Sequence, residues 1–192
     1  MATRSVIGKY NNTTGGVKSV YCHYDGYPEY VGKILVNHYN TPEKVTKLIS
    51  MGDISSLEKS IGKKHDFNMP YNEKEKLGYT TFYHRDRGDE LRINSNKSIK
   101  EYLLDANERW ADYVYIYWGT KGDDTPTASK GWEYIQPYGL NIKDTPITSL
   151  QWKSLEGYKK KGEDKERILK ILSKYDQSII GKLQTQIEEF FE

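Results

Sequence analysis

The sequence contains a single cysteine, Cys22, and no long apolar run. One cysteine excludes an intramolecular disulfide, and it excludes zinc sites built from four Cys or from two Cys and two His. Disulfides are rare in reducing compartments, so this cysteine usage is typical of a cytosolic protein. The first residues form no apolar signal-peptide core, and no segment reaches transmembrane length. We therefore expect a soluble cytosolic domain with no membrane partner.

A strong net charge is also missing. The chain has 192 residues, with 29 Lys and Arg against 27 Asp and Glu, which gives a formal charge of +2. Proteins that bind duplex DNA usually carry a clear basic excess, so the composition argues against duplex DNA as the partner. A mimic of duplex DNA would be strongly acidic, and this chain is not. Its length suffices for one sizeable domain.

Known catalytic signatures are absent as well. The sequence has no G-x-S-x-G motif, no Walker loop and no G-x-G-x-x-G fingerprint. His84-Arg85-Asp86 has the letters of the kinase catalytic loop, but none of the other kinase motifs accompanies it. We therefore assign no catalytic residue, no metal ligand and no cofactor.

The N-terminal part predicts a β-hairpin followed by short helices. Residues 5–10 and 17–24 have strand patterns around a turn that ends in Gly15-Gly16. Cys22 alternates with Tyr21 and His23, so its thiol is expected in the core. Apolar spacing predicts three helices, over residues 29–39, from Pro42 to just before Gly52 with Thr41 as N-cap, and over residues 53–61. Residues 63–76 have no period and are interpreted as a loop.

The strongest strand pattern in the chain lies at residues 113–118. It follows a predicted strand at 79–83, a charged turn at 84–90 and a capping box that opens a short helix at Ser98. Its expected partner is residues 131–135, across a long polar loop. One face of the strong strand is apolar, and the other consists of Tyr113, Tyr115 and Tyr117. That tyrosine face is either packed under a helix or offered to a ligand.

From residue 163 to residue 192 the apolar residues recur at helical spacing. This pattern predicts an amphipathic helix that either closes the core or forms the seam of a homodimer. The fold class expected is α+β, with a mainly antiparallel sheet, an N-terminal hairpin, several short helices and this C-terminal helix. We expect one domain over residues 1–192. Its parts are a core at 1–95, a helix and tyrosine-rich hairpin at 96–160, and the C-terminal helix at 163–192.

Two groups of polar residues are candidates for a recognition site. The first lies at the end of the hairpin and comprises Tyr21, His23, Asp25, Tyr27 and Glu29. Residues two apart in a strand share a face, so Tyr21 and His23 are expected to project together. The group either holds the turn by hydrogen bonds, binds a divalent metal together with His38, or contacts a ligand.

The second group is the charged turn that carries Arg85 and Arg87. Its arginines either form ion pairs with the neighbouring acids or bind a phosphate or carboxylate, because the guanidinium fork is bidentate. Exposed ion pairs stabilise little, so anion recognition is the more informative hypothesis. We expect the hairpin end and this turn to converge on one open surface.

Several segments resemble a family of small accessory proteins of tailed bacteriophages and prophages. The resemblance rests on Ala2-Thr3-Arg4-Ser5, on residues 21–29, on Gly32-Lys33-Ile34-Leu35, on His38-Tyr39 and on residues 85–89, and it covers about the first 90 residues in segments. The family often has Trp in place of Tyr24, and Gly or Tyr in place of His84, which argues against a catalytic His84. The resemblance implies a biological context and no particular activity.

These observations favour a non-enzymatic, phage-encoded binding protein in the cytoplasm of a host bacterium. It would inhibit or divert a host system, such as an immune complex or a signalling nucleotide, so its partner is a host protein or a small nucleotide. The binding residues expected are Tyr21, His23, Asp25, Tyr27, Glu29, Arg85, Arg87, Tyr113, Tyr115 and Tyr117. The alternative is a small phosphodiesterase or nuclease in which metal-binding histidines and acids act beside the two arginines.

Overall fold

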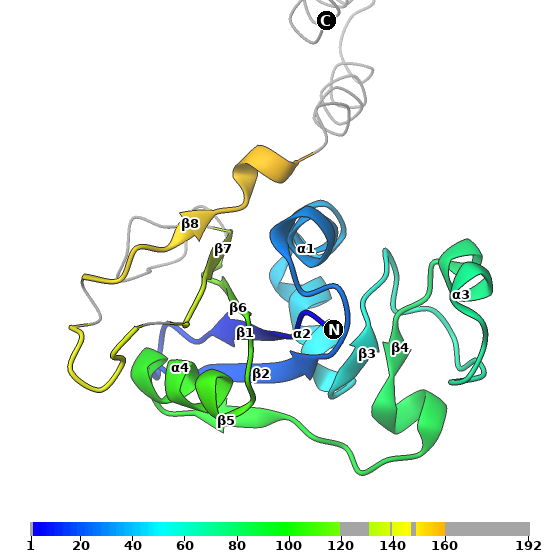
Figure 1. The fold of residues 1–192 in the computed structure, drawn as a ribbon, viewed down its shortest axis with the longest axis horizontal. Coiled ribbons are helices and arrows are strands. Elements are labelled where there is room, and N and C mark those ends of the chain that lie inside the picture. Colours follow the sequence, from blue (N-terminus) through cyan, green and yellow to red (C-terminus); the bar gives the residue numbers. More distant parts are fainter. Residues whose placement is uncertain (1, 120–130, 139, 147–148, 160–192) are drawn as a thin grey trace, which may run out of the picture. The chain divides into compact units, whose positions relative to one another are not determined.

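Eight strands form one mixed sheet in the computed structural model, which describes residues 2–119, 131–138, 140–146 and 149–159. The strands follow the order β4-β3-β2-β1-β6-β7-β8, and β5 pairs with β2 beside this path. All of them belong to the unit Met1–Tyr158. The fold is therefore α+β, as the sequence predicts (Figure 1). The predicted C-terminal helix at 163–192 lies outside the described residues.

The predicted hairpin forms the centre of the sheet. β1 (Ser5–Tyr10) pairs antiparallel with β2 (Val17–Cys22), with Ser5 opposite Cys22. On its other side β1 runs parallel to β6 (Tyr113–Tyr117). β6 pairs antiparallel with β7 (Trp132–Ile135), which confirms the second predicted pairing, and β8 (Lys153–Ser154) adds an outer strand.

Helices cover both faces of the central strands (Figure 1). One face packs against the π-helical turn η1 (Pro28–Gly32), α1 (Lys33–His38) and α2 (Pro42–Ser50), in the cluster that contains Ile7 and Cys22. The other face packs against α4 (Ile99–Glu108), in the cluster that contains Val6 and Ile116. Alternate residues of β1 and β6 therefore enter two different cores.

The predicted helix caps are confirmed. The Thr41 hydroxyl accepts a hydrogen bond from the backbone N–H of Lys44, at 3.4 Å, at the start of α2. The Ser98 hydroxyl accepts one from the N–H of Glu101, at 3.2 Å, at the start of α4. Each satisfies an N–H group that has no partner within its helix.

Two sequence predictions are wrong. Residues 54–56 form a strand, β3 (Ile54–Ser56), and not a helix, because Ile54 lies parallel beside Cys22 and its backbone carbonyl accepts from the N–H of His23. Pairing with β2 overrides the helical spacing. In the segment interpreted as a loop, α3 (Tyr71–Leu77) is helical. It buries no residue, so no apolar period could reveal it.

The remaining elements connect these layers. β4 (Thr81–Phe82) pairs antiparallel with β3 and is followed by the π-helical turn η2 (Tyr83–Arg87), so the predicted strand at 79–83 is shorter than expected. β5 (Asn94–Asn96) pairs with the first half of β2 and was not predicted, because its three polar residues lack a strand pattern. The 3-10 turn η4 (Glu156–Tyr158) ends the described chain.

Gly8 tests how tightly α4 packs on β1. A Cβ atom at Gly8 would lie 2.7 Å from Cζ of Tyr102 and 2.7 Å from Cγ1 of Val17. We expect Gly8→Ala to lower the free energy of unfolding by about 2 kcal/mol, because an overpacked core must shift side chains or backbone. Urea denaturation followed by circular dichroism measures the change. The matched control is Gly157→Ala, whose Cβ meets nothing within 4 Å; equal stability of the two variants would contradict the packing.

Candidate functional site

The tyrosine face of β6 is packed under helices, which decides between the two interpretations of that strand. Tyr115 and Tyr117 are completely buried, and only Tyr113 is partly exposed. The Tyr115 hydroxyl donates to the carbonyl of Gly26 at 2.8 Å, and the Tyr117 hydroxyl donates to the carbonyl of Asn40 at 3.5 Å. The prediction that Tyr115 and Tyr117 bind a partner is therefore wrong. Both side chains belong to the core beneath η1 and α1 and reach no accessible surface.

At the end of the hairpin, Tyr21 and His23 do project together. The Tyr21 hydroxyl lies 2.8 Å from Nδ1 of His23, which is hydrogen-bond distance. Burial raises the pKa of Tyr21 to about 12. Burial, and then the positive charge of Arg4, lowers the pKa of His23, so the imidazole is neutral at neutral pH. The pair is polar, half-buried and uncharged.

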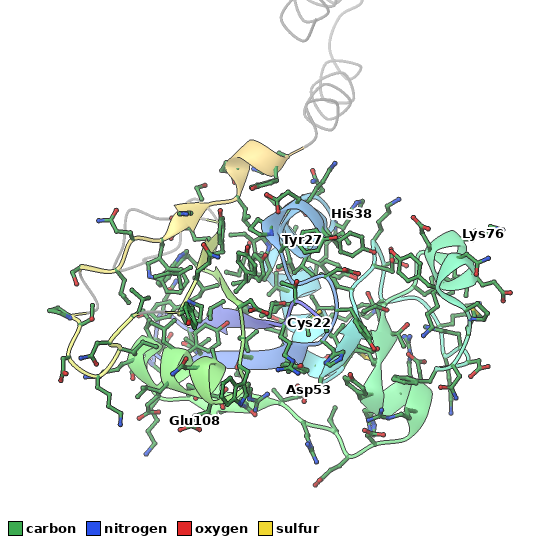
Figure 2. The ribbon with its side chains drawn as sticks, in the orientation of Figure 1. Cys22, Tyr27, His38, Asp53, Lys76 and Glu108 are labelled. Carbon is green, nitrogen blue, oxygen red and sulfur yellow. The ribbon has the colours of Figure 1, made fainter. Side chains whose placement is uncertain are left out.

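The other members of the first group separate from this pair. Asp25 has a left-handed backbone, with φ of 54°, at the turn that leads into η1. Tyr27 lies beside α1 (Figure 2), and Glu29 accepts a 3.3 Å hydrogen bond from the Tyr158 hydroxyl. In the part of the chain that the structure describes, no group of three or more His, Cys, Asp or Glu side chains could hold a metal ion.

Arg85 is largely buried, and its guanidinium is bonded within the protein. Its guanidinium donates to the carboxylate of Asp86, at 2.8 and 2.9 Å, and to the backbone carbonyls of Ile61 and Thr80, each at 2.7 Å. The same group lies over the ring of Phe82. With its donors bonded to backbone and Asp86, Arg85 holds the segment around residue 61 against β4, and its predicted binding role is corrected.

Asp86 is the acceptor that organises this turn. Its buried carboxylate accepts from Arg85 and from the backbone N–H groups of Phe82, at 2.8 Å, and His65, at 3.2 Å. Burial disfavours the charged form, but these hydrogen bonds outweigh burial and lower the pKa of the carboxyl group below its ordinary value. The turn is therefore a salt-bridged structure, one of the two interpretations left open by the sequence.

Arg87, in contrast, reaches the surface. It forms an ion pair with Asp89, and its guanidinium lies 4.5 Å from the ring centre of Tyr83 and 4.9 Å from that of Phe67. Burial raises the pKa of Tyr83, and the nearby Tyr24 raises it further. Tyr83 therefore lies close to Tyr24 at the end of the hairpin. Arg87 therefore belongs to an aromatic cluster.

The two predicted segments come together across β3. The N–H of Tyr83 donates to the carbonyl of Asp53 at 3.1 Å, and the N–H of Tyr21 donates to the Asp53 carboxylate at 2.8 Å. Cys22 and Asp53 mark this junction in Figure 2. The hairpin end and the turn therefore meet through Asp53, which contacts Tyr21 and Tyr83, while Arg85 and Glu29 bond to other parts of the chain.

The structure adds Trp110 to this region, which the sequence did not indicate. Trp110 follows the last turn of α4, is 78% exposed and has a φ of 56°. The guanidinium of the neighbouring Arg109 lies 3.2 Å from the carboxylate of Asp105 and 3.8 Å from the carboxylate of Asp53. Arg109 therefore connects the end of α4 to Asp53. Glycine is the residue usually found at such a left-handed position after a helix.

Arg4 completes the region. Its backbone N–H donates to the Asp112 carboxylate at 2.8 Å, and its charge acts on Tyr21 and His23. Its guanidinium has no hydrogen-bond or ion-pair partner among the residues that the structure describes. We define the recognition surface as the following residues: Arg4, Tyr21, His23, Tyr24, Tyr83, Arg87, Arg109 and Trp110.

Comparisons with known proteins returned no relative. No protein-family model matches the chain, no curated protein matches it, and no solved structure matches it. Among the described residues, none of the helices has the length and apolar character needed to cross a membrane. The site is therefore interpreted from its own geometry.

The contrast between the two arginines can be measured. We expect Arg85→Lys to lower the free energy of unfolding by about 2 kcal/mol, because lysine cannot replace the bidentate, charge-assisted hydrogen bonds inside the protein. Arg87→Lys should leave stability close to wild type, because Arg87 is solvent-exposed. Urea denaturation of both variants at pH 7 compares them. Equal destabilisation by the two substitutions would show that Arg85 is no more internal than Arg87.

Proposed function

We propose that this chain is a phage-encoded, non-enzymatic binding protein that inhibits or diverts a host protein in the bacterial cytoplasm. The recognition surface is the contact region in this proposal. The observation that carries it is Trp110, a large aromatic side chain exposed to solvent on a backbone conformation that favours glycine. Binding gives a reason for keeping a tryptophan there, whereas stability does not.

The backbone conformation of Trp110 costs free energy. A residue with a Cβ atom in the left-handed region loses about 1 kcal/mol or more relative to glycine. Because Trp110 is 78% exposed, its side chain regains little of this by packing within the chain. Strained residues that persist without a local gain are concentrated at functional sites.

The composition of the surface also favours a protein partner. Trp, Tyr and Arg dominate the energetics of protein–protein interfaces, because they bury large areas and form directed polar contacts. The recognition surface combines Trp110 and the 47%-exposed Tyr24 with the Tyr21–His23 pair and with Arg4, whose charge acts on that pair. A small ligand would require a concave site, whereas the members of this surface are spread over the start of β1, the end of β2, η2 and the end of α4.

Charge indicates the chemistry of the partner. Arg87 and Arg109 already have carboxylates of this chain, Asp89 for the first and Asp53 and Asp105 for the second. The Arg4 guanidinium has no such partner among the described residues, so a partner carboxylate can pair with it. We infer a protein partner with an apolar pocket for Trp110 and an acidic group near Arg4.

The biological context of the proposal comes from the family resemblance. Small phage accessory proteins often act on host enzymes or defence complexes, and a defence complex is the target class that we favour. The phosphodiesterase alternative has weaker support, because the donors of Arg85 are bonded inside the protein. A homodimer through residues 163–192 stays a prediction, since that segment lies outside the described residues.

Trp110→Gly separates stability from binding. We expect this variant to gain about 1 kcal/mol in free energy of unfolding, because glycine adopts the left-handed backbone without strain. We expect it to lose the host partner, because the exposed indole is removed. Urea denaturation measures the first effect, and quantitative co-purification of the tagged full chain from bacterial cells, followed by binding assays with the purified host protein, measures the second.

The matched control is Tyr71→Ala, which removes another exposed aromatic side chain, 57% exposed on α3. This control should retain the host protein at wild-type level. The proposal is wrong if wild type and Trp110→Gly recover the same host proteins with equal affinity, or if wild type binds none directly. Turnover of a nucleotide or nucleic acid that disappears in His23→Ala would favour the enzyme instead.

A further inference from the structure

A second candidate site lies at the opposite end of β2 from the recognition surface. It is a pocket of about 560 Å³ between the sheet, the hairpin turn and α2. The lining residues that matter for its chemistry are Lys9, Lys18, Asn12, Thr13, Ile49 and Ile93. Its volume is in the range of sites for small molecules and cofactors.

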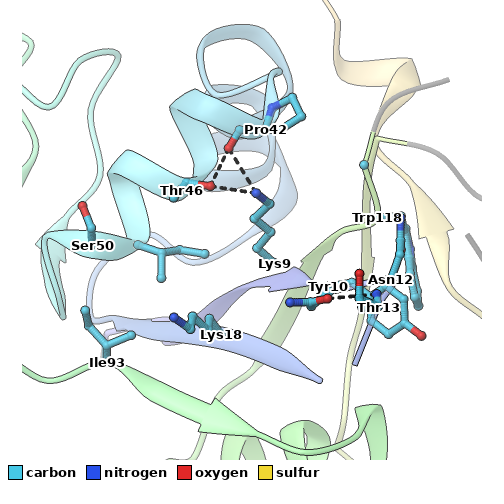
Figure 3. Close-up of a pocket in the computed structure, with 13 residues that line it drawn as sticks. Lys9, Tyr10, Asn12, Thr13, Lys18, Pro42, Thr46, Ser50, Ile93 and Trp118 are labelled. Carbon is cyan, nitrogen blue, oxygen red and sulfur yellow. Dashed lines mark hydrogen bonds between the residues drawn. The ribbon is translucent and has the colours of Figure 1, made fainter. Parts of the chain in front are cut away.

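Two lysines define the charge of this pocket. Lys9 on β1 and Lys18 on β2 are direct partners in the antiparallel register and lie on the same face of the sheet, beneath α2 (Figure 3). Like charges placed opposite each other in a sheet are destabilising. The lining contains no Asp or Glu among the described residues, so no carboxylate in the pocket offsets this repulsion.

The two ammonium groups have different surroundings. Nζ of Lys9 donates to the Thr46 hydroxyl at 2.7 Å and lies 3.4 Å from the carbonyl of Pro42, which fixes it under the first turn of α2. Nζ of Lys18 has no hydrogen-bond or ion-pair partner in the described ranges, and the residue is exposed. The pocket therefore presents one positioned cation and one cation that has no protein partner among the described residues.

Glu43 is the nearby acid that responds to Lys9. Hydrogen bonds from its own backbone N–H and from the Thr41 side chain lower the pKa of Glu43, and the charge of Lys9 contributes less. Glu43 is thus committed to the first turn of α2, where a carboxylate is stabilised by the helix dipole. It does not line the pocket, so the charged side chains of the lining are the two lysines.

The rest of the lining matches a ligand with both a polar and an apolar part. The side chains of Asn12 and Thr13 supply neutral donors, and Ile49 and Ile93 supply apolar walls. Phosphate groups bind to lysine ammonium groups and hydroxyl donors, while a planar base binds against aromatic and apolar side chains. A nucleoside phosphate combines these two parts in one small molecule.

We propose that this pocket binds a nucleoside phosphate, with the phosphate groups on Lys9 and Lys18 and the base against Ile49 and Ile93. The inference is independent of the proposed function, because it concerns another end of the sheet and shares no residue with the recognition surface. A host-protein partner and a nucleotide are two separate ligands of one chain. Failure of either leaves the other standing.

Isothermal titration of the full chain with ATP, ADP, adenosine and inorganic phosphate tests the pocket. ATP and ADP should bind, and adenosine and inorganic phosphate should bind at least about tenfold more weakly, because each keeps only one half of the contacts. Raising the salt concentration should weaken ATP binding through screening of the partly exposed lysines. Equal affinity for ATP and inorganic phosphate would contradict a nucleoside site.

Lys18→Gln is the decisive variant. It should weaken ATP binding by about tenfold, the effect of losing one hydrogen bond to a charged group, and the free protein should be as stable as wild type or slightly more so, because the repulsion from Lys9 is removed. The control Lys47→Gln removes an exposed lysine of α2 outside the lining and should bind ATP as wild type does. The proposal is overturned if ATP at millimolar concentration produces no binding heat, or if both variants weaken binding equally.

The same titration distinguishes the two proposals. Trp110→Gly should bind ATP with wild-type affinity, and Lys18→Gln should retain the host protein. Loss of ATP binding in Trp110→Gly would show that the pocket and the recognition surface are not separate, which would contradict the inference.

Discussion

The sheet buries tyrosines at its centre, and each of these tyrosine hydroxyls needs a hydrogen-bond partner inside the protein. The Tyr102 hydroxyl donates to the carbonyl of Tyr115 at 2.7 Å and also lies 3.2 Å from that of Val6, so α4 is attached to β6 and β1. The Tyr39 hydroxyl donates to the carbonyl of Glu58 at 2.9 Å. A buried hydroxyl without a partner would cost about 1–3 kcal/mol. These bonds therefore fix where the helices and loops cross the sheet.

This constraint also positions the surfaces that remain for binding. The hydroxyl of Tyr115 holds the carbonyl of Gly26, so the turn after β2 cannot move away from β6. The Asp53 carboxylate, just before β3, accepts a hydrogen bond from the backbone N–H of Tyr21. Between these points β2 ends beyond the cover of α4, and Tyr21, His23 and Tyr24 become accessible there. The exposed aromatic residues are thus a consequence of how far α4 extends, and Trp110 lies where α4 ends.

The sequence predicts elements whose apolar pattern matches their final environment. The hairpin, α2 with its Thr41 cap, and the pairing of β6 with β7 have such patterns and are confirmed. β3 is missed because pairing of Ile54 with Cys22 decides its structure, and that pairing is not local in sequence. The tyrosine face was ambiguous because alternation shows that residues share a face but not what covers it. The exposed position of Trp110 depends on a left-handed backbone angle, and the lysine pocket depends on the register that pairs Lys9 with Lys18. No pattern of residues in the sequence indicates either feature.

The division of the tyrosines into structural and accessible sets is the central claim. Nitration of the native full chain with tetranitromethane, mapped by mass spectrometry, measures the accessibility of each ring. The structure predicts rapid modification of Tyr24 and Tyr71 and protection of Tyr102, Tyr115 and Tyr117 until the protein is unfolded in urea. Modification of Tyr115 and Tyr117 in the native protein at the rate of Tyr24 would contradict this account, because those rings would then be available to a ligand.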